Sequence, residues 1–221
     1  MWCIGSPNGE YLAKMEDVLE VYNTLPQSGV RRLCMDERPC QLIGDVYTPL
    51  PMKPGSVAKL DAEYEKKGTC VAFLAYDIDS GERYVWINKT RTKKDYAEFI
   101  DILCTNDQYA GAEKILLIQD NLNTHGYGSL YENLPINRAA ELRRKIEFHF
   151  TPKHGSWLNA AEIEFSALSR QCLDRRIPSM EKMIEEVEAW QNKRNQLKVK
   201  VSWSFTVDMA RDKLKRHYDF R

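Results

Sequence analysis

Three acidic residues that lie far apart in the sequence are candidates for one catalytic site. Asp36 is in the apolar run RLCMDE, and Asp120 ends the run KILLIQD. Glu162 lies in HGSWLNAAEIEFSALSR, where a loop leads into a helix. Carboxylate oxygens suit Mg²⁺, and no cysteine or histidine spacing typical of zinc is present. These residue types indicate a site where two divalent ions clamp a phosphodiester for in-line attack.

A structural interpretation of the same residues stays open. Each carboxylate could be a strand-end or helix-capping group, and the run NAAE from Asn159 to Glu162 fits a capping box. Glu37 and Glu164 are rival acidic candidates. Neighbours on a strand point to opposite faces, and Glu164 lies about 200° round the helix from Glu162. Only one member of each pair can face a shared site, and we expect Glu164 to be exposed to solvent.

The elements that must position these residues are predicted from hydrophobic periodicity. Strands are predicted over Val30–Asp36, Gly68–Asp77, Glu82–Lys89, Lys114–Asp120 and Ile146–Phe150. Helices are predicted over Gly9–Tyr22, Thr92–Cys104, part of Leu130–Arg144, Asn159–Leu173, Ser179–Arg194 and Thr206–Tyr218. We expect the Pro- and charge-rich stretch Arg38–Gly68 to be a long connection with little regular structure. The fold class is α/β, a mixed five-stranded sheet flanked by helices.

Composition sets the broad class of protein. The chain has 221 residues, 43% hydrophobic and 29% charged, which is typical of a globular protein. Its formal charge is zero, so nucleic-acid binding would have to come from local patches. The six cysteines lack a C-x-x-C pair and are interpreted as reduced thiols in a cytoplasmic protein. We expect no signal peptide, and no apolar run approaches the ~20 residues needed to cross a membrane.

Several stretches resemble one known family. CMDE, IQDNLNTH and TPKHGSWLNAAEIEFSALSR are similar to the catalytic domain of IS630-family transposases, within the wider Tc1/mariner group. The opening WCIGSPNGEYLAKMEDVLEVY is similar to the linker of that family. The resemblance implies a linker with an N-terminal helix over 1–29, an RNase H-like catalytic domain over 30–175 and a helical extension over 176–221. It also implies a D-D-E triad of Asp36, Asp120 and Glu162 as catalytic residues and metal ligands.

What the resemblance implies about function is specific. The triad would hold two Mg²⁺ ions, for which Mn²⁺ can substitute. The enzyme would cut DNA at transposon ends and join the freed 3′-hydroxyl to target DNA at TA sites. A homodimer is expected in the active complex, in a cytoplasmic, nucleoid-associated protein. The alternatives are an RNase H-like nuclease without strand transfer, and a non-catalytic remnant that binds DNA.

Two features depart from the family pattern. Asp120 and Glu162 are 42 positions apart, longer than the commonest spacing, and we place the extra residues in a tolerant loop over Gly126–Pro135. The helix-turn-helix module that reads the terminal repeats is absent from this sequence. We expect that module to have been cut off or to be encoded separately, which puts sequence-specific DNA binding by this chain in doubt.

Polar residues around the triad are candidate DNA contacts, namely Asn123, His125, Lys153, His154, Ser156, Trp157 and Asn159. Asn123 and His125 could instead orient Asp120 or cap the next helix, and Trp157 could be a buried anchor. A basic tail offers a second surface for the DNA backbone, although a solvated helix face explains it as well. Its basic residues are Lys193, Arg194, Lys198, Lys200, Arg211, Lys213, Lys215, Arg216 and Arg221, against Asp208, Asp212 and Asp219.

Overall fold

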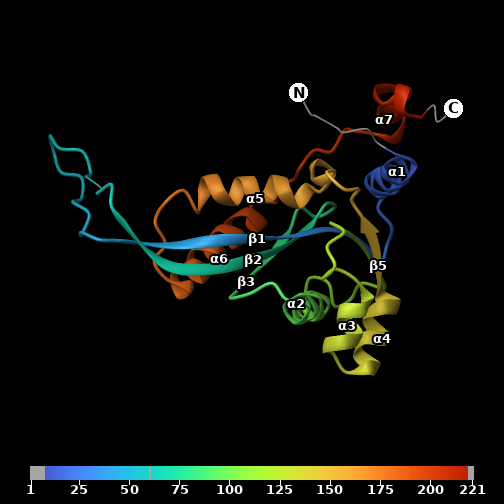
Figure 1. Cartoon of the computed structure of the whole chain (residues 1–221), viewed down its shortest axis with the longest axis horizontal. Coiled ribbons are helices and arrows are strands. Elements are labelled where there is room, and N and C mark those ends of the chain that lie inside the picture. Colours follow the sequence, from blue (N-terminus) through green and yellow to red (C-terminus); the bar gives the residue numbers. More distant parts are fainter. Residues whose placement is uncertain (1–7, 60, 219–221) are drawn as a thin grey trace.

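The computed structural model describes residues 8–59 and 61–218 and is built around one five-stranded sheet. The strands are β1 (Val30–Asp45), β2 (Tyr64–Asp77), β3 (Arg83–Asn88), β4 (Lys114–Gln119) and β5 (Ile146–Phe150). Their order is β3-β2-β1-β4-β5 (Figure 1). The β1–β2 and β2–β3 pairs are antiparallel, and the β1–β4 and β4–β5 pairs are parallel. The predicted mixed sheet is confirmed.

Helices cover both faces of this sheet. They are α1 (Gly9–Asn23), α2 (Lys93–Thr105), α3 (Tyr127–Asn133), α4 (Ile136–Lys145), α5 (Ala160–Gln171), α6 (Met180–Gln196) and α7 (Val207–Lys213), with 3₁₀ turns η1 (Ser156–Leu158) and η2 (Lys215–His217). One core cluster joins the sheet to α1, α5 and α6, and the other joins it to α2, α3 and α4. Figure 1 shows α5 and the α2–α4 group on opposite sides of the sheet.

The alternation of β1 decides which acidic side chain faces which layer. Cys34 belongs to the core under α1 and α5, whereas Met35 belongs to the core under α2 and α3. Because side chains alternate along a strand, Asp36 continues the face of Cys34 and Glu37 continues the face of Met35. Asp36 is therefore the acidic residue of β1 on the side of α5.

The expectation of an irregular connection over Arg38–Gly68 is wrong at both ends of that stretch, although no helix or strand is assigned to residues 46–59 and 61–63. β1 continues to Asp45 and β2 begins at Tyr64, so the two strands form a long arm that projects from the body (Figure 1). Pro39 lies inside β1, opposite Val71. Proline is tolerated on an edge, and pairing of β1 with β4 ends at Cys34, so Pro39 faces no second partner strand.

The tolerant loop expected over Gly126–Pro135 is also wrong, because most of it is helix α3. Leu130 and Ser129 in this helix are buried, and α3 packs against α2. A helix of only seven residues carries little periodic signal, and tertiary packing holds it in place.

Parts of three predictions fall on residues that lie outside the described ranges. They are residues 1–7 of the linker resemblance, Cys3 among the thiols, and Asp219 and Arg221 in the basic tail. Within the described ranges, the helices are all too short or too polar to cross a bilayer. Cys34, Cys40, Cys70, Cys104 and Cys172 are free thiols.

Candidate active site

Asp36 and Asp120 lie at matching positions on two neighbouring parallel strands. The last paired residues of β1 and β4 are Cys34 and Ile118. Asp36 comes two residues after Cys34, and Asp120 comes two residues after Ile118. Cys34 and Ile118 both belong to the core under α5, so the aspartates continue that same face of the sheet. The structure thus brings two of the three predicted carboxylates to one edge, where open α/β sheets place their ligands.

Glu162 reaches this edge because the start of α5 is fixed to β1. Asn159 is the N-cap of α5, and its Oδ1 accepts from the Ala161 N–H at 3.1 Å. Its Nδ2 donates to the Met35 carbonyl at 2.9 Å, one residue before Asp36. Among the described residues the Glu162 carboxylate makes no bond back to Asn159, so the capping box is not formed. The exposed carboxylate is left for the site.

The three carboxylates interact electrostatically. Burial raises the pKa of Asp36 to about 8, and the charges of Glu162, Glu37 and Asp120 push it in the same direction. In the part of the chain that the structure describes, no three His, Cys, Asp or Glu side chains are gathered tightly enough to hold a metal ion. The predicted ligands therefore share one edge without forming a finished metal cluster. An all-oxygen set whose members repel one another fits a divalent cation.

His125 connects Asp120 with Glu37; its contact with Asp120 is one of the roles considered from the sequence, whereas its contact with Glu37 was missed. Its Nδ1 lies 2.7 Å from Asp120 Oδ1, and its Nε2 lies 3.0 Å from Glu37 Oε2. The ring also stacks on Tyr96, with 4.7 Å between centroids. Burial lowers the pKa of His125, but the hydrogen bonds with Asp120 and Glu37 outweigh it and bring that pKa to about 9. His125 is thus a buried imidazolium that orients Asp120, and the prediction that it contacts DNA is wrong.

Two further predictions about individual side chains are corrected. Asn159 is 1% exposed and holds α5 to β1, so it is not available as a DNA contact. Glu164 is 1% exposed and lies 3.0 Å from Arg83 and 2.8 Å from Arg194. Because Glu164 lies on the opposite side of α5 from Glu162, its side chain lies between the sheet and α6. There Arg83 and Arg194 balance its charge.

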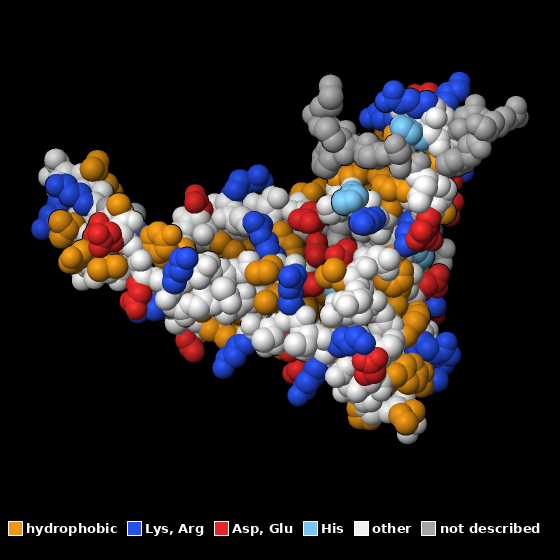
Figure 2. All heavy atoms as spheres, in the orientation of Figure 1, with side chains coloured by type: hydrophobic (Ala, Val, Ile, Leu, Met, Phe, Trp, Pro, Cys, Tyr) orange, Lys and Arg blue, Asp and Glu red, His pale blue; other side chains and the backbone are white. Residues whose placement is uncertain are grey.

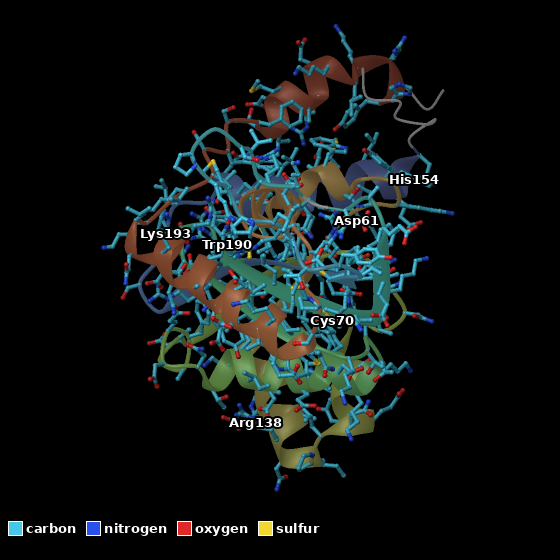
Figure 3. All side chains as sticks on the ribbon, turned by 90° about the vertical axis from the view of Figure 1, so that its left-hand side faces the viewer. Asp61, Cys70, Arg138, His154, Trp190 and Lys193 are labelled. Atoms are coloured by element: carbon cyan, nitrogen blue, oxygen red, sulfur yellow. The ribbon has the colours of Figure 1, made fainter. Side chains whose placement is uncertain are left out.

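The loop before α5 supplies the exposed candidates for DNA contact. Lys153, His154 and Ser156 are exposed and line a groove of about 750 Å³, together with Asp120 and the first residues of α1. Figure 3 shows His154 beside α1, far from Arg138 on α4. Figure 2 shows acidic side chains gathered on this face, with basic and histidine side chains next to them. Asn123 is exposed on the loop after β4.

Trp157 and the basic tail are partly engaged in packing. The Trp157 ring is half-buried and meets Phe205 edge-on, with 5.6 Å between centroids. In the tail, Arg211 pairs with Glu16 and Arg194 pairs with Glu164, which removes part of its excess positive charge. Both observations favour a packing role for these particular side chains.

Comparison with known proteins places this site in a family context. Residues 31–184 match the family model described as DDE superfamily endonuclease. No curated protein matches the chain significantly. Solved structures that it resembles include the Mos1 mariner paired end complex with Mn, with a TM-score of 0.55 and 12% identity over 98% of this chain and 64% of that one. Another is the Mos1 transposase paired-end complex with left transposon end, with a TM-score of 0.59 and 13% identity over 90% and 61%.

The Mos1 Strand Transfer Complex gives a similar result, with a TM-score of 0.55 and 13% identity over 90% of this chain and 61% of that one. This chain spans less than two thirds of the length of these Mos1 chains. At such low identity the likeness establishes the fold, which confirms the predicted RNase H-like architecture. The family match covers more than half of the chain and includes the three carboxylates. The chain therefore belongs to the DDE superfamily endonucleases.

Proposed function

We propose that this chain is the catalytic part of a DDE transposase of the IS630 and Tc1/mariner type. It cuts DNA at transposon ends and joins the freed 3′-hydroxyl to target DNA at TA sites. It works in the cytoplasm on nucleoid DNA. The observation that supports this proposal is the matched placement of Asp36 and Asp120 on β1 and β4, together with the hydrogen bond that ties the start of α5, the helix of Glu162, to β1.

Asp36, Asp120 and Glu162 would hold two Mg²⁺ ions, and Mn²⁺ would substitute for them. Bound ions would supply activation of the attacking water or 3′-hydroxyl and stabilisation of the leaving oxygen. The chain's own contribution is to set the ligands. His125 and the Leu122 N–H, which lies 3.2 Å away, both contact Oδ1 of Asp120, and this fixes the direction of its carboxylate.

DNA is proposed to approach along the groove beside Asp120. Lys153 and His154 border it and are suited to contacts with phosphate oxygens. Ser156 and Asn123 would add neutral hydrogen bonds, and Trp157 would lie at the far end of the same loop. Lys14 of α1 also lines the groove, where it pairs with Glu10 at 2.9 Å.

We further propose a homodimer in the active complex, formed through the β1–β2 arm. The end of the arm exposes large apolar side chains, namely Val46, Tyr47, Leu50, Met52, Val57 and Tyr64. Figure 2 shows hydrophobic side chains together with basic ones at the end of the projecting arm. Exposed apolar groups gathered in this way mark interaction surfaces. Shortening the arm to a tight turn is expected to halve the mass of the DNA-bound complex in light scattering. An unchanged dimer mass would contradict this role.

The enzymatic proposal is tested with a labelled duplex that carries a free 3′-hydroxyl, a supercoiled plasmid and Mg²⁺ or Mn²⁺. The wild-type chain is expected to nick the plasmid and to join the label to it, and Asp120→Asn is expected to do neither. Asp107→Asn, an exposed aspartate on the loop after α2, is the matched control. Wild-type rates of nicking or joining in Asp120→Asn would overturn the assignment.

The same experiment separates the alternatives. Nicking without joined label would identify a nuclease that lacks strand transfer. DNA binding that is indifferent to metal and to Asp36→Ala, without any nicking, would identify a non-catalytic remnant.

A further inference from the structure

The first three N–H groups of α5, the helix that carries Glu162, all have hydrogen-bond partners. The first N–H groups of a helix have no partner within the helix. Here the Ala160 N–H donates to Tyr22 Oη at 3.0 Å, and the Ala161 N–H donates to Asn159 Oδ1 at 3.1 Å. The Glu162 N–H donates to the Asn159 carbonyl at 3.1 Å. The backbone of the catalytic glutamate is therefore fixed by Tyr22 and Asn159.

Tyr22 makes this connection from helix α1, which is distant from α5 in the sequence but packs on the same face of the sheet. It lies near the end of α1, and its hydroxyl donates to the Leu158 carbonyl at 2.8 Å while it accepts from Ala160. The same oxygen lies 3.1 Å from Cys34 Sγ on β1. Burial holds the pKa of Tyr22 well above its ordinary value, so the hydroxyl keeps the proton that it donates. One hydroxyl thus joins α1, β1, η1 and α5.

The C-terminal segment covers the ring of Tyr22. Trp203 stacks on it with 4.1 Å between ring centroids and 9° between planes. Trp203 is fixed in turn, because its Nε1 donates to the Phe205 carbonyl at 2.9 Å. The neighbouring Val201 N–H donates to Tyr76 Oη at 2.8 Å. Nothing in the proposed reaction uses this segment directly, yet it lies against the residue that fixes the start of α5.

We propose that Tyr22 and Trp203 are positioning residues for Glu162, and that the segment around Trp203 is a working part of the catalytic centre. The inference rests on the proposed function, because it assigns these residues to the same carboxylate site. Asn159 ties the helix to β1 beside Asp36, and Tyr22 ties the preceding turn to α1. Together they set the separation of Glu162 from Asp36. Small misplacements of catalytic groups cost large factors in rate, which gives such a clamp a function beyond stability.

Two variants separate the parts of the clamp. Tyr22→Phe keeps the ring and its stacking on Trp203 but removes the hydroxyl. Trp203→Leu keeps the hydroxyl and removes the stacking. Tyr131→Phe is the matched control, because it removes a tyrosine hydroxyl from an exposed position on α3. All are full chains, compared with wild type by hydrogen–deuterium exchange without metal, by Mn²⁺ titration and by plasmid nicking.

Tyr22→Phe is expected to speed exchange in residues 158–164 and to weaken Mn²⁺ binding by about tenfold or more. Its maximal nicking rate is expected to fall by about 10–100-fold while its DNA dissociation constant stays within twofold. Trp203→Leu is expected to change the same quantities in the same direction, and Tyr131→Phe is expected to change none. Wild-type exchange, Mn²⁺ affinity and nicking in both clamp variants would overturn the inference.

The outcome is distinguishable from failure of the proposed function. A wild-type chain that nicks DNA while both clamp variants match it leaves the proposed function standing and removes the clamp. A wild-type chain that neither binds Mn²⁺ nor nicks DNA removes the proposed function. Exchange in residues 158–164 then still reports whether Tyr22 and Trp203 hold the helix start.

Discussion

The Nδ1 atom of His125 lies 2.7 Å from Oδ1 of Asp120, so a buried imidazole supports one carboxylate of the predicted triad. The other ring nitrogen faces Glu37, so the imidazolium is balanced by one carboxylate on each side. The adjacent acidic residues of β1 thereby take different tasks. Asp36 lies on the face of the proposed metal site, and Glu37 contacts the histidine that is bonded to Asp120.

Replacing this histidine is expected to weaken the metal site without removing a ligand. His125→Gln should lower the nicking rate at limiting Mn²⁺ by about 10–100-fold, because residues that orient a metal ligand contribute that much to affinity or activity. The loss should shrink at saturating Mn²⁺. His154→Gln, an exposed histidine on the groove, should keep the wild-type Mn²⁺ requirement. An unchanged Mn²⁺ requirement in His125→Gln would refute the orienting role.

The stability of the metal-free protein is expected to fall as pH rises from 6 to 9. In the folded state the pKa of Asp36 is about 8, well above that of an ordinary aspartate. The unfolded chain therefore releases this proton at lower pH, and the free energy of unfolding falls as pH rises toward 8. His125 acts in the same direction. Its favourable contribution is complete below its ordinary pKa near 6.5 and is lost as pH passes about 9. Urea unfolding in EDTA at pH 6 and pH 9 measures this difference.

The neutral variant of Asp36 tests the cause of that slope. Asp36→Asn should raise the free energy of unfolding at pH 8 by about 1–3 kcal/mol, after allowance for solvent screening, and should flatten the pH dependence. At pH 2 the same variant should match the wild type, because the Asp36 carboxyl is then protonated in both the folded and the unfolded state. A stability that rises between pH 6 and 9 would show that other groups dominate.

Two glutamates on the same helix are expected to separate catalysis from stability. Glu164→Gln leaves Arg83 and Arg194 without their buried counter-charge and should cost about 3 kcal/mol or more of unfolding free energy. Glu162→Gln alters an exposed side chain and should change stability by no more than about 0.5 kcal/mol while it abolishes nicking. Chemical denaturation and plasmid nicking on both variants measure the two effects. The opposite pattern would reverse the assignment of the two residues.

The limits of sequence reasoning follow from what each signal contains. Strand alternation and the chain's apolar runs were enough to predict five strands, and motif resemblance pointed to Asp36, Asp120 and Glu162. Neither signal reports which polar side chains become buried. His125 and Asn159 look like surface groups in a polar loop, but tertiary contacts to Glu37 and Met35 bury them. The sequence signal for the Asp120–His125–Glu37 contact was a histidine five positions after Asp120 together with a second acidic residue next to Asp36.

The wrong predictions have a common physical origin. Glu164 was expected in solvent because a charged residue without a known partner is normally exposed, and its arginines come from β3 and α6, distant in sequence. The arm beyond Arg38 was expected to be irregular because of its prolines and charges. Antiparallel pairing within a hairpin arm satisfies the hydrogen-bonding groups of the backbone without requiring a regular apolar pattern. The local composition therefore gave no sign of these strands.

Phosphate contact by the groove is expected to show in the salt dependence of DNA binding. Lys153→Ala should weaken binding across DNA sequences and reduce the slope of log affinity against log salt by about 1. Lys93→Ala is the control, because Lys93 pairs with Glu132 on the other side of the sheet. Fluorescence anisotropy at several salt concentrations measures the slope. Equal slopes in both variants would move the DNA path away from this groove.

The sharing of divalent cations by three distant carboxylates is tested most directly by anomalous diffraction from crystals soaked in Mn²⁺. We expect anomalous density between Asp36, Asp120 and Glu162, with a carboxylate oxygen of each within about 2.3 Å of an ion. Crystals of Asp120→Asn should show that density weakened or lost. Wild-type crystals with Mn²⁺ bound elsewhere, or with Glu162 out of reach of the other two, would contradict the account.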